Sequence, residues 1–179
     1  MKRQMAFKKK KITALIPARG GSRGIKNKNL SMVGGKKLIS YSISSALKSR
    51  YIDKVVVSTD SLKIANYSKK NGAIIPGLRP SIYSKDSSST ESVISHYIKN
   101  WISEDEIIIL LQPTSPIRSS ATIDKAITKF FNGKYDSLLS LSKVKNNFIW
   151  KLKGKLSIHK YDIKNRKRRQ DIKIEDSIF

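Results

Sequence analysis

Two strand-length apolar runs, each with an abrupt end, constrain the fold of this chain more than any other feature. Residues 12–17 (ITALIP) lead into a glycine cluster, and residues 107–111 (IIILL) stop at a Gln-Pro pair. Short, continuous hydrophobicity without alternation is typical of strands that are buried on both faces of a parallel sheet. Further strands are predicted at residues 54–58, 73–75 and 137–141.

Segments with apolar residues at helical spacing separate these strands. The first covers residues 38–47, and the second is predicted to start with Asp60 as its cap and to stop at Asn71-Gly72. Asp60 also follows a predicted strand and could approach the site at the strand ends, but we favour the cap. The S-x-x-E spacing of residues 88–91 predicts a capping box for a third helix, and a fourth is predicted at about residues 120–131. This alternation of strands and helices at short spacing predicts a doubly wound, mainly parallel α/β domain.

The patterning divides the chain into three parts. Residues 1–11 are a basic extension, residues 12–142 are the α/β core, and residues 143–179 combine a predicted hairpin with a basic tail. The hairpin would pair residues 148–152 with residues 155–158.

Positive charge is concentrated at the two ends of the chain, which together carry more than half of the formal net charge of +24. A sequence-independent nucleic-acid surface is one interpretation. A general excess of lysine on solvated faces and frayed termini is the other, and we favour it because lysine is plentiful throughout. Nucleic acid is therefore not the expected partner.

Composition excludes several classes of protein. The chain has no cysteine, which removes disulfide scaffolds, thiol catalysis and cysteine-built zinc sites. His159 has no motif around it, and His96 lies at helical spacing from Val93, Tyr97 and Trp101, which predicts a structural role. No apolar stretch reaches the roughly 18 residues that span a bilayer, and no signal peptide is predicted, so the expectation is a cytoplasmic protein without a membrane partner.

The loop after the first strand, residues 18–30 (ARGGSRGIKNKNL), has the ingredients of a phosphate-binding turn. Glycines let the backbone approach a phosphate, their N–H groups can surround it, and arginine and lysine offset its charge. The loop matches neither the P-loop pattern nor the G-x-G-x-x-G fingerprint. In an open parallel sheet, ligands bind beyond the carboxyl ends of the strands where the strand order reverses. We therefore predict a polyphosphate site here, with a plain surface loop as the alternative.

At this loop a family resemblance becomes visible. Residues 16–30 resemble the N-terminal signature of the bacterial cytidylyltransferases that activate sialic acids and related nonulosonates as CMP-sugars. Later segments are similar to further motifs of the family and occur in the same order: VVVSTD at 55–60, LRP at 78–80 with 86–90, LLQPTSPIR at 110–118 and DSLLS at 136–140. The resemblance covers about residues 11–170.

The resemblance implies both a fold and a reaction. The fold would be the three-layer α/β/α arrangement of nucleotide-diphospho-sugar transferases, with residues 12–142 binding the nucleotide and residues 143–179 serving as a hairpin dimerisation extension of a homodimer. The reaction would transfer CMP from CTP to the anomeric hydroxyl of a nonulosonic acid and release pyrophosphate, with Mg²⁺ as cofactor. Its product would feed surface glycans such as lipopolysaccharide.

The resemblance also implies roles for individual residues. Arg19 would contact the triphosphate, and Lys28 would stabilise charge at the α-phosphate and the departing pyrophosphate, which makes these two the catalytic candidates. The other candidates would bind substrate: Gly20, Gly21, Ser22 and Arg23 in the loop, Asn29 and Arg79 at the cytidine, Ser88 or Thr90 at the base, and Gln112 between nucleotide and sugar.

Each assignment has an ordinary structural alternative. The loop cations could be solubilising residues, Asn29 a turn residue, and Ser88 and Thr90 the start of a helix. Arg79 could be a surface cation, whereas the amide of Gln112 at a strand end must find polar partners.

The end of the chain departs from the family pattern. Members continue to a late Asp-x-Asp pair that binds the metal, whereas this sequence stops at Phe179, so no metal-ligating residue is predicted and the chain is expected to be truncated. Two further functions stay open: a catalytically inactive nucleotide-binding remnant, and a basic nucleic-acid-binding protein.

Overall fold

The computed structural model describes residues 10–22, 24–102, 106–141, 150–153 and 155–158. The chain divides into two compact units, Met1–Leu138 and Leu139–Phe179.

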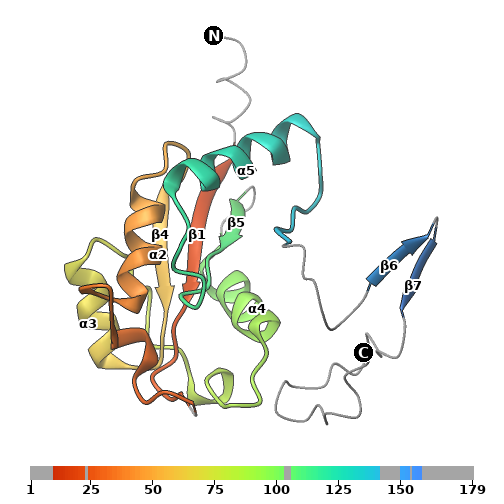
Figure 1. Ribbon diagram of the computed structural model, residues 1–179. Coiled ribbons are helices and arrows are strands. Elements are labelled where there is room, and N and C mark those ends of the chain that lie inside the picture. The colour runs from red at the N-terminus through yellow and green to blue at the C-terminus, as the bar shows by residue number, and fades with distance from the viewer. Residues whose placement is uncertain (1–9, 23, 103–105, 142–149, 154, 159–179) are drawn as a thin grey trace. The chain divides into compact units, whose positions relative to one another are not determined.

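A parallel three-stranded sheet forms the centre of the first unit (Figure 1). Its strands, in spatial order, are β4 (Lys54–Ser58), β1 (Lys11–Pro17) and β5 (Glu106–Leu110). The chain runs from β1 to its neighbour β4 and later returns to the other side of β1 to form β5, so the strand order reverses between β1 and β5. The predicted parallel α/β sheet is confirmed.

Helices cover both faces of the sheet (Figure 1). The helices α2 (Leu38–Leu47), α3 (Leu62–Lys70) and α5 (Ser120–Asn132) bury apolar side chains on one face, and α4 (Thr90–Trp101) lies on the other. The result is the three-layer α/β/α arrangement.

Side chains of β1 point alternately to the two faces of the sheet and pack against the helices on each face. Ile12 and Ile16 pack in the cluster that includes Ile43 of α2, whereas Leu15 points to the opposite face and packs with Tyr97 of α4. Because both faces are covered, every position from 12 to 16 can be buried, and this is why the strand reads as a continuous apolar run.

The caps of two helices differ from the prediction by one residue. Ser61, not Asp60, caps α3, because its backbone is extended and its Oγ accepts a hydrogen bond from the N–H of Ile64 at 3.4 Å. Ser89, not Ser88, caps α4 and accepts from the N–H of Ser92 at 3.2 Å. In each case the extended residue next to the first helical residue holds the cap position.

Smaller elements complete the loops around the sheet. They are the 3-10 turns η1 (Lys28–Leu30) and η2 (Ser81–Tyr83) and the short antiparallel pair β2 (Met32–Val33) and β3 (Lys36–Lys37). The turn between β2 and β3 is Gly34-Gly35, whose φ angles of 53° and 79° are both in the region that glycine adopts without strain.

Two of the predicted strands do not form as expected. Residues 73–75 contribute a single parallel bridge from Ile74 to Val56 rather than a strand. Residues 137–141 form no strand in the structure, and Leu139 and Leu141 are 78% and 85% exposed. A strand depends on a hydrogen-bonded neighbour, and within the described part of the chain this segment has no β-ladder.

The second unit contains the predicted hairpin. The strands β6 (Trp150–Lys153) and β7 (Lys155–Ile158) pair antiparallel, with Trp150 opposite Ile158. Phe148 and the basic segments 1–9 and 159–179 lie outside the described residues. Among the helices described, none is long and apolar enough to span a bilayer.

Candidate functional site

A pocket of about 300 Å³ lies at the carboxyl ends of β1 and β5, where the strand order reverses. Pro17, the last residue of β1, and Gln112, just after β5, both line it. Eight of the residues predicted from sequence contribute to its walls: Arg19, Ser22, Lys28, Asn29, Arg79, Ser88, Thr90 and Gln112. The fold thus brings together three loops that are far apart in the sequence.

The glycines of the first loop have different surroundings. Gly20 donates its backbone N–H to Oδ1 of Asp60 at 2.8 Å, and a Cβ at this position would lie 2.9 Å from Cβ of Ser61. Gly21 has nothing within 4 Å of an added Cβ. The Gly20 N–H, expected at a phosphate, therefore has a carboxylate partner, and Arg23 lies outside the described residues.

Arg19 lines the pocket and is paired with a carboxylate that also lines it. Its Nη2 lies 2.7 Å from Oδ1 of Asp86, with about a third of each side chain exposed. Its backbone carbonyl accepts a hydrogen bond at 3.0 Å from Nδ2 of the buried Asn29. Asn29 therefore fixes the loop from within, and Lys28 beside it is half-buried in the pocket wall.

Arg79 is a buried cation in the pocket wall, only 5% exposed. Its Nη1 donates to the carbonyl of Ser58 at 3.1 Å, and its Nε donates to Oγ of Ser84 at 2.9 Å. Burial lowers the pKa of Arg79, as does the nearby charge of Arg19, and the carboxylate of Asp60 acts in the opposite direction. These hydrogen bonds offset part of the desolvation cost of burying the guanidinium beside the end of β4.

Gln112 is exposed, and its backbone is held in place. Its carbonyl accepts from Oγ of Ser42 and from Nη2 of Arg118, each at 3.5 Å. The side-chain amide has no hydrogen bond to any described residue, so it is available to a ligand.

The other wall of the pocket comes from the start of α4. Ser88 donates from Oγ to the carbonyl of Ile82 at 3.0 Å, and Thr90 is the first residue of the helix.

His96 of α4 packs between Tyr83 and Trp101, at ring distances of 4.6 and 4.9 Å. Burial, and next the charge of Arg79, lowers the pKa of His96, which has the structural position predicted for it.

Three charged residues at this site were not among those predicted from the sequence. Asp86 and Lys85 line the pocket beside Ser88, and Arg118 holds the loop that carries Gln112. Burial lowers the pKa of Arg118. Asp86 and Arg118 lie within the family-like motifs, which was the available signal.

The charge of the pocket suits a polyanion. Four of the residues that form it are cationic and one is a carboxylate: Arg19, Lys28, Arg79 and Lys85 against Asp86. Across the described ranges, no three His, Cys, Asp or Glu side chains cluster as metal ligands. Because Asp86 is paired with Arg19, this donor set does not fit a magnesium site.

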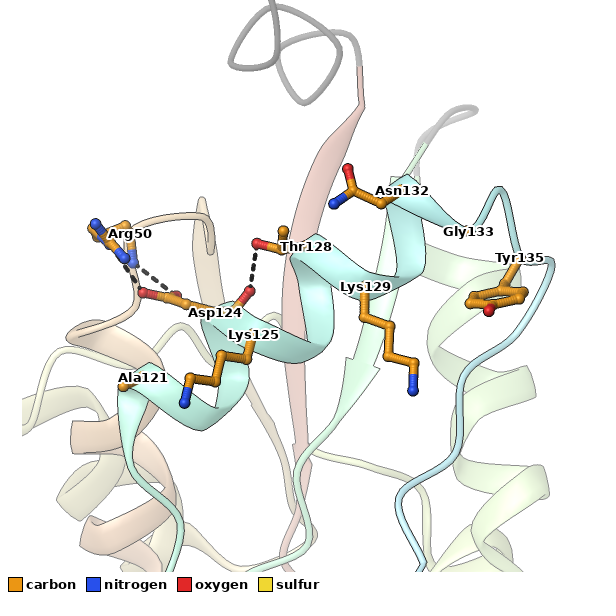
Figure 2. A pocket seen from close by; sticks show the side chains of 9 residues that line it. All are labelled: Arg50, Ala121, Asp124, Lys125, Thr128, Lys129, Asn132, Gly133 and Tyr135. Carbon is orange, nitrogen blue, oxygen red and sulfur yellow. Dashed lines mark hydrogen bonds and ion pairs between the residues drawn. The ribbon is translucent and has the colours of Figure 1, made fainter.

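A second cavity of about 630 Å³ lies along α5 (Figure 2). Its only buried charged side chain is Asp124, which accepts hydrogen bonds from Oγ of Ser49 at 2.6 Å and from the backbone and side chain of Arg50. Arg50 precedes Asp53, whose carboxylate accepts from the N–H of Ile12 at the amino end of β1. This cavity therefore lies near the amino ends of the strands, whereas the predicted site lies at their carboxyl ends. The lysines of the cavity are exposed.

The sequence is similar to those of known proteins. The family described as "Cytidylyltransferase" matches residues 13–172. An N-acylneuraminate cytidylyltransferase of Escherichia coli is 38% identical over 134 residues, which are 74% of this chain and 32% of that protein. A CMP-N,N'-diacetyllegionaminic acid synthase of Legionella pneumophila is 38% identical over 120 residues, 65% of this chain and 52% of that protein. The chain thus spans between about a third and a half of the length of these relatives.

A solved structure shows the same fold. It is a CMP:2-keto-3-deoxy-manno-octonic acid synthetase complexed with CTP, with a TM-score of 0.58 and 23% sequence identity. The match covers 69% of this chain and 48% of that one.

Proposed function

The chain belongs to the cytidylyltransferase family, and from that premise we propose that it transfers CMP from CTP to a sugar acid of the nonulosonate type. The anomeric hydroxyl oxygen of the sugar attacks the α-phosphorus and loses its proton to solvent. The bond between the α-phosphorus and the bridging oxygen breaks, and pyrophosphate leaves with the electron pair. The observation that carries the proposal is the pocket at the switch point of the sheet, where Arg19, Lys28 and Lys85 face one cavity beside the amide of Gln112.

Positive charge in this pocket is what the reaction needs. CTP carries about four negative charges and the sugar carries a carboxylate, so two anions must meet at the reacting centre. Arg19 and Lys28 would bind the phosphates, and Ser22 and Gly21 would offer hydroxyl and backbone N–H donors at the same loop. We also propose that Arg23 of this loop binds phosphate, as predicted from the sequence.

The remaining residues would recognise the nucleoside and the sugar. Ser88 or Thr90 would meet the base, and Asn29 and Arg79 would shape the cytidine site, because both are buried and already bonded to backbone groups. Gln112 would lie between nucleotide and sugar, since its exposed amide projects from a fixed backbone.

The names of the relatives support the substrate class. The two curated relatives are named for N-acylneuraminate and for diacetyllegionaminic acid, and the structural relative is named for a 2-keto-3-deoxy-octonic acid. A 2-keto sugar acid is common chemistry to all three. We propose the same class for this chain, together with a homodimer.

Magnesium is part of the proposal as a companion of the triphosphate. The described carboxylate at the pocket, Asp86, is paired with Arg19 and does not make a metal site. The chemistry assigned above to Arg19, Lys28 and Gln112 does not depend on a protein-bound ion.

Pyrophosphate release tests the proposed function. Purified protein is incubated with CTP, Mg²⁺ and one of several 2-keto sugar acids, and CTP binding is measured in parallel by calorimetry, with UTP for comparison. We expect release with at least one sugar acid and a preference for CTP over UTP. Binding of CTP with no release from any sugar acid would rule out the transferase activity of this chain, and equal binding of CTP and UTP would rule out cytosine recognition.

Substitution at the pocket makes the test specific to this site. Arg19→Ala removes a phosphate-binding guanidinium and is expected to weaken CTP binding by one to two orders of magnitude, because a hydrogen bond to a charged group contributes about 1.5–3 kcal/mol. Lys129→Ala, in the cavity along α5, is the matched loss of a cation and should leave binding unchanged. If the two variants bind CTP equally well, the nucleotide is not at this pocket.

A further inference from the structure

The peptide group that joins Arg19 to Gly20 is held at both of its ends. Its carbonyl, on Arg19, accepts a hydrogen bond from Nδ2 of Asn29 at 3.0 Å. Its N–H, on Gly20, donates to Oδ1 of Asp60 at 2.8 Å. A peptide group is planar, so two hydrogen bonds on its opposite sides fix its orientation and with it the direction in which the Arg19 side chain leaves the backbone.

Asp60 reaches this peptide from the end of β4. Ala18 donates its backbone N–H to the carbonyl of Ser58 at 2.9 Å, so the first residue after β1 still follows the neighbouring strand. Two residues further on, the loop meets Asp60, which is just past the carboxyl end of β4. The space is tight, since a Cβ on Gly20 would lie 2.9 Å from Cβ of Ser61. Glycine at position 20 is therefore what lets the loop come within reach of the carboxylate.

The same strand end also holds the second cationic loop. The backbone carbonyl of Thr59 accepts a hydrogen bond from the backbone N–H of Arg79 at 2.7 Å. The backbone carbonyl of Ser58 accepts one from the Arg79 guanidinium at 3.1 Å. The negative charge of Asp60 acts favourably on this buried guanidinium. The end of β4 thus connects to Arg19 on one side and to Arg79 on the other.

From these contacts we infer that Asp60 is a positioning residue for the nucleotide site: its carboxylate holds the Arg19–Gly20 peptide so that the Arg19 guanidinium faces the pocket. The inference rests on the proposed function for the identity of the ligand. Asp60 itself does not line the pocket and is not a candidate ligand for the phosphates. It acts through the backbone of Gly20, and its job as a helix cap is taken by Ser61.

Two substitutions at Asp60 separate the backbone contact from the charge. Asp60→Asn keeps a side-chain oxygen that can accept the Gly20 N–H but loses the negative charge. Asp60→Ala loses both. If Asp60 acts by holding the peptide, CTP should bind to Asp60→Asn within about threefold of the original protein and to Asp60→Ala at least tenfold more weakly. If both variants lose binding equally, the charge beside Arg79 is what matters and the inference is wrong.

A matched control exists at the other edge of the sheet. Asp53 also accepts a backbone N–H with its carboxylate, from Ile12 at 2.7 Å, but it lies at the amino end of β1. Asp53→Ala should lower the melting temperature and leave the CTP dissociation constant unchanged. Weakened CTP binding in Asp53→Ala would show that loss of general stability, rather than positioning, explains the effect at Asp60.

Hydrogen exchange provides a readout that does not need the nucleotide. The Gly20 amide should exchange slowly in the original protein and in Asp60→Asn and rapidly in Asp60→Ala, as measured by NMR on the full chain. If the original protein binds no CTP but shows this pattern, the proposed function fails while the clamp on the peptide stands. Fast exchange of Gly20 in the original protein, or CTP binding that is the same in all three proteins, overturns the inference.

Discussion

The guanidinium of Arg19 and the carboxylate of Asp86 lie 2.7 Å apart in the wall of the pocket. The residue proposed to bind a phosphate is therefore paired with a negative charge of the protein itself. About a third of each side chain is exposed, so water weakens the attraction, and such pairs contribute about 0–1 kcal/mol. A triphosphate can replace this partner at low cost.

Asp86→Asn is expected to tighten CTP binding in the absence of divalent cations. The substitution frees Arg19 and removes a negative charge that repels the phosphates, and the two effects together should lower the dissociation constant by about two- to tenfold. Calorimetry in a chelating buffer measures it, and the gain should shrink as salt is added. Asp136→Asn, an exposed carboxylate, is the control. Weaker binding in Asp86→Asn would mean that this carboxylate assists the nucleotide.

Strands and helices with a clear apolar spacing were predicted well, because their signal is local in the sequence. The apolar run of β1 and the helical spacing of α2 both correspond to elements of the structure. The pocket itself was also predictable, since a doubly wound sheet places loops at a known edge.

Contacts between distant segments were not predictable. Asp60 suits a helix cap by local rules, but Ser61 next to it takes that position, and the Asp60 carboxylate reaches Gly20, 40 residues earlier. The pairing of Asp86 with Arg19 depends in the same way on tertiary structure. The strand expected at residues 137–141 fails for a related reason: its leucines are suited to a strand, but a strand also needs a neighbour with which to form hydrogen bonds.

Glu106 is the first residue of β5 and lies at the amino ends of the strands, opposite the pocket. Its fully buried carboxylate accepts hydrogen bonds from the hydroxyl of Thr13, from Nζ of Lys54 at 3.1 Å and from the hydroxyl of Tyr97 at 3.3 Å. Burial alone would lower the pKa of Lys54, but the hydrogen bonds to Glu106 and Tyr97 outweigh burial and raise this pKa above 10.5. Burial raises the pKa of Tyr97 above 10.0, and the charge of Glu106 adds to the effect.

These shifts predict a loss of stability at alkaline pH. Both groups hold their protons more tightly in the folded state than in the unfolded state, so their contribution is complete below about pH 10 and disappears as the pH rises through the folded pKa values. Glu106→Gln should reduce the unfolding free energy by about 1–3 kcal/mol at neutral pH. It should also make the decline above about pH 10 shallower, because the carboxylate is the main cause that raises the pKa of Lys54 and adds to the burial that raises the pKa of Tyr97. Melting curves from neutral to alkaline pH test this, and parallel declines in the two proteins would contradict it.

Asp124→Ala is expected to destabilise the fold without affecting the nucleotide. The buried carboxylate connects α5 to the end of α2 through Ser49 and Arg50, at the edge of the sheet away from the pocket (Figure 2). Its loss leaves these donors unpaired and should cost about 1–3 kcal/mol of unfolding free energy. Denaturant unfolding measures the loss, and calorimetry should show unchanged CTP affinity under conditions where the variant is folded. A change in affinity would place the cavity along α5 in the nucleotide site.

Gly20→Ala should weaken CTP binding where Gly21→Ala does not. An added Cβ at position 20 would lie 2.9 Å from Cβ of Ser61, a distance that forces the loop away from the end of β4, whereas position 21 has open space. Overpacking of this kind typically costs about 1–3 kcal/mol. If the loop relieves the strain by moving Arg19 out of the pocket, the CTP affinity should fall by roughly five- to a hundredfold. Calorimetry on the two variants measures the contrast between neighbouring glycines that carry the same substitution. Equal affinities would show that the close approach of Gly20 to Ser61 does not determine how the loop presents Arg19 to the nucleotide.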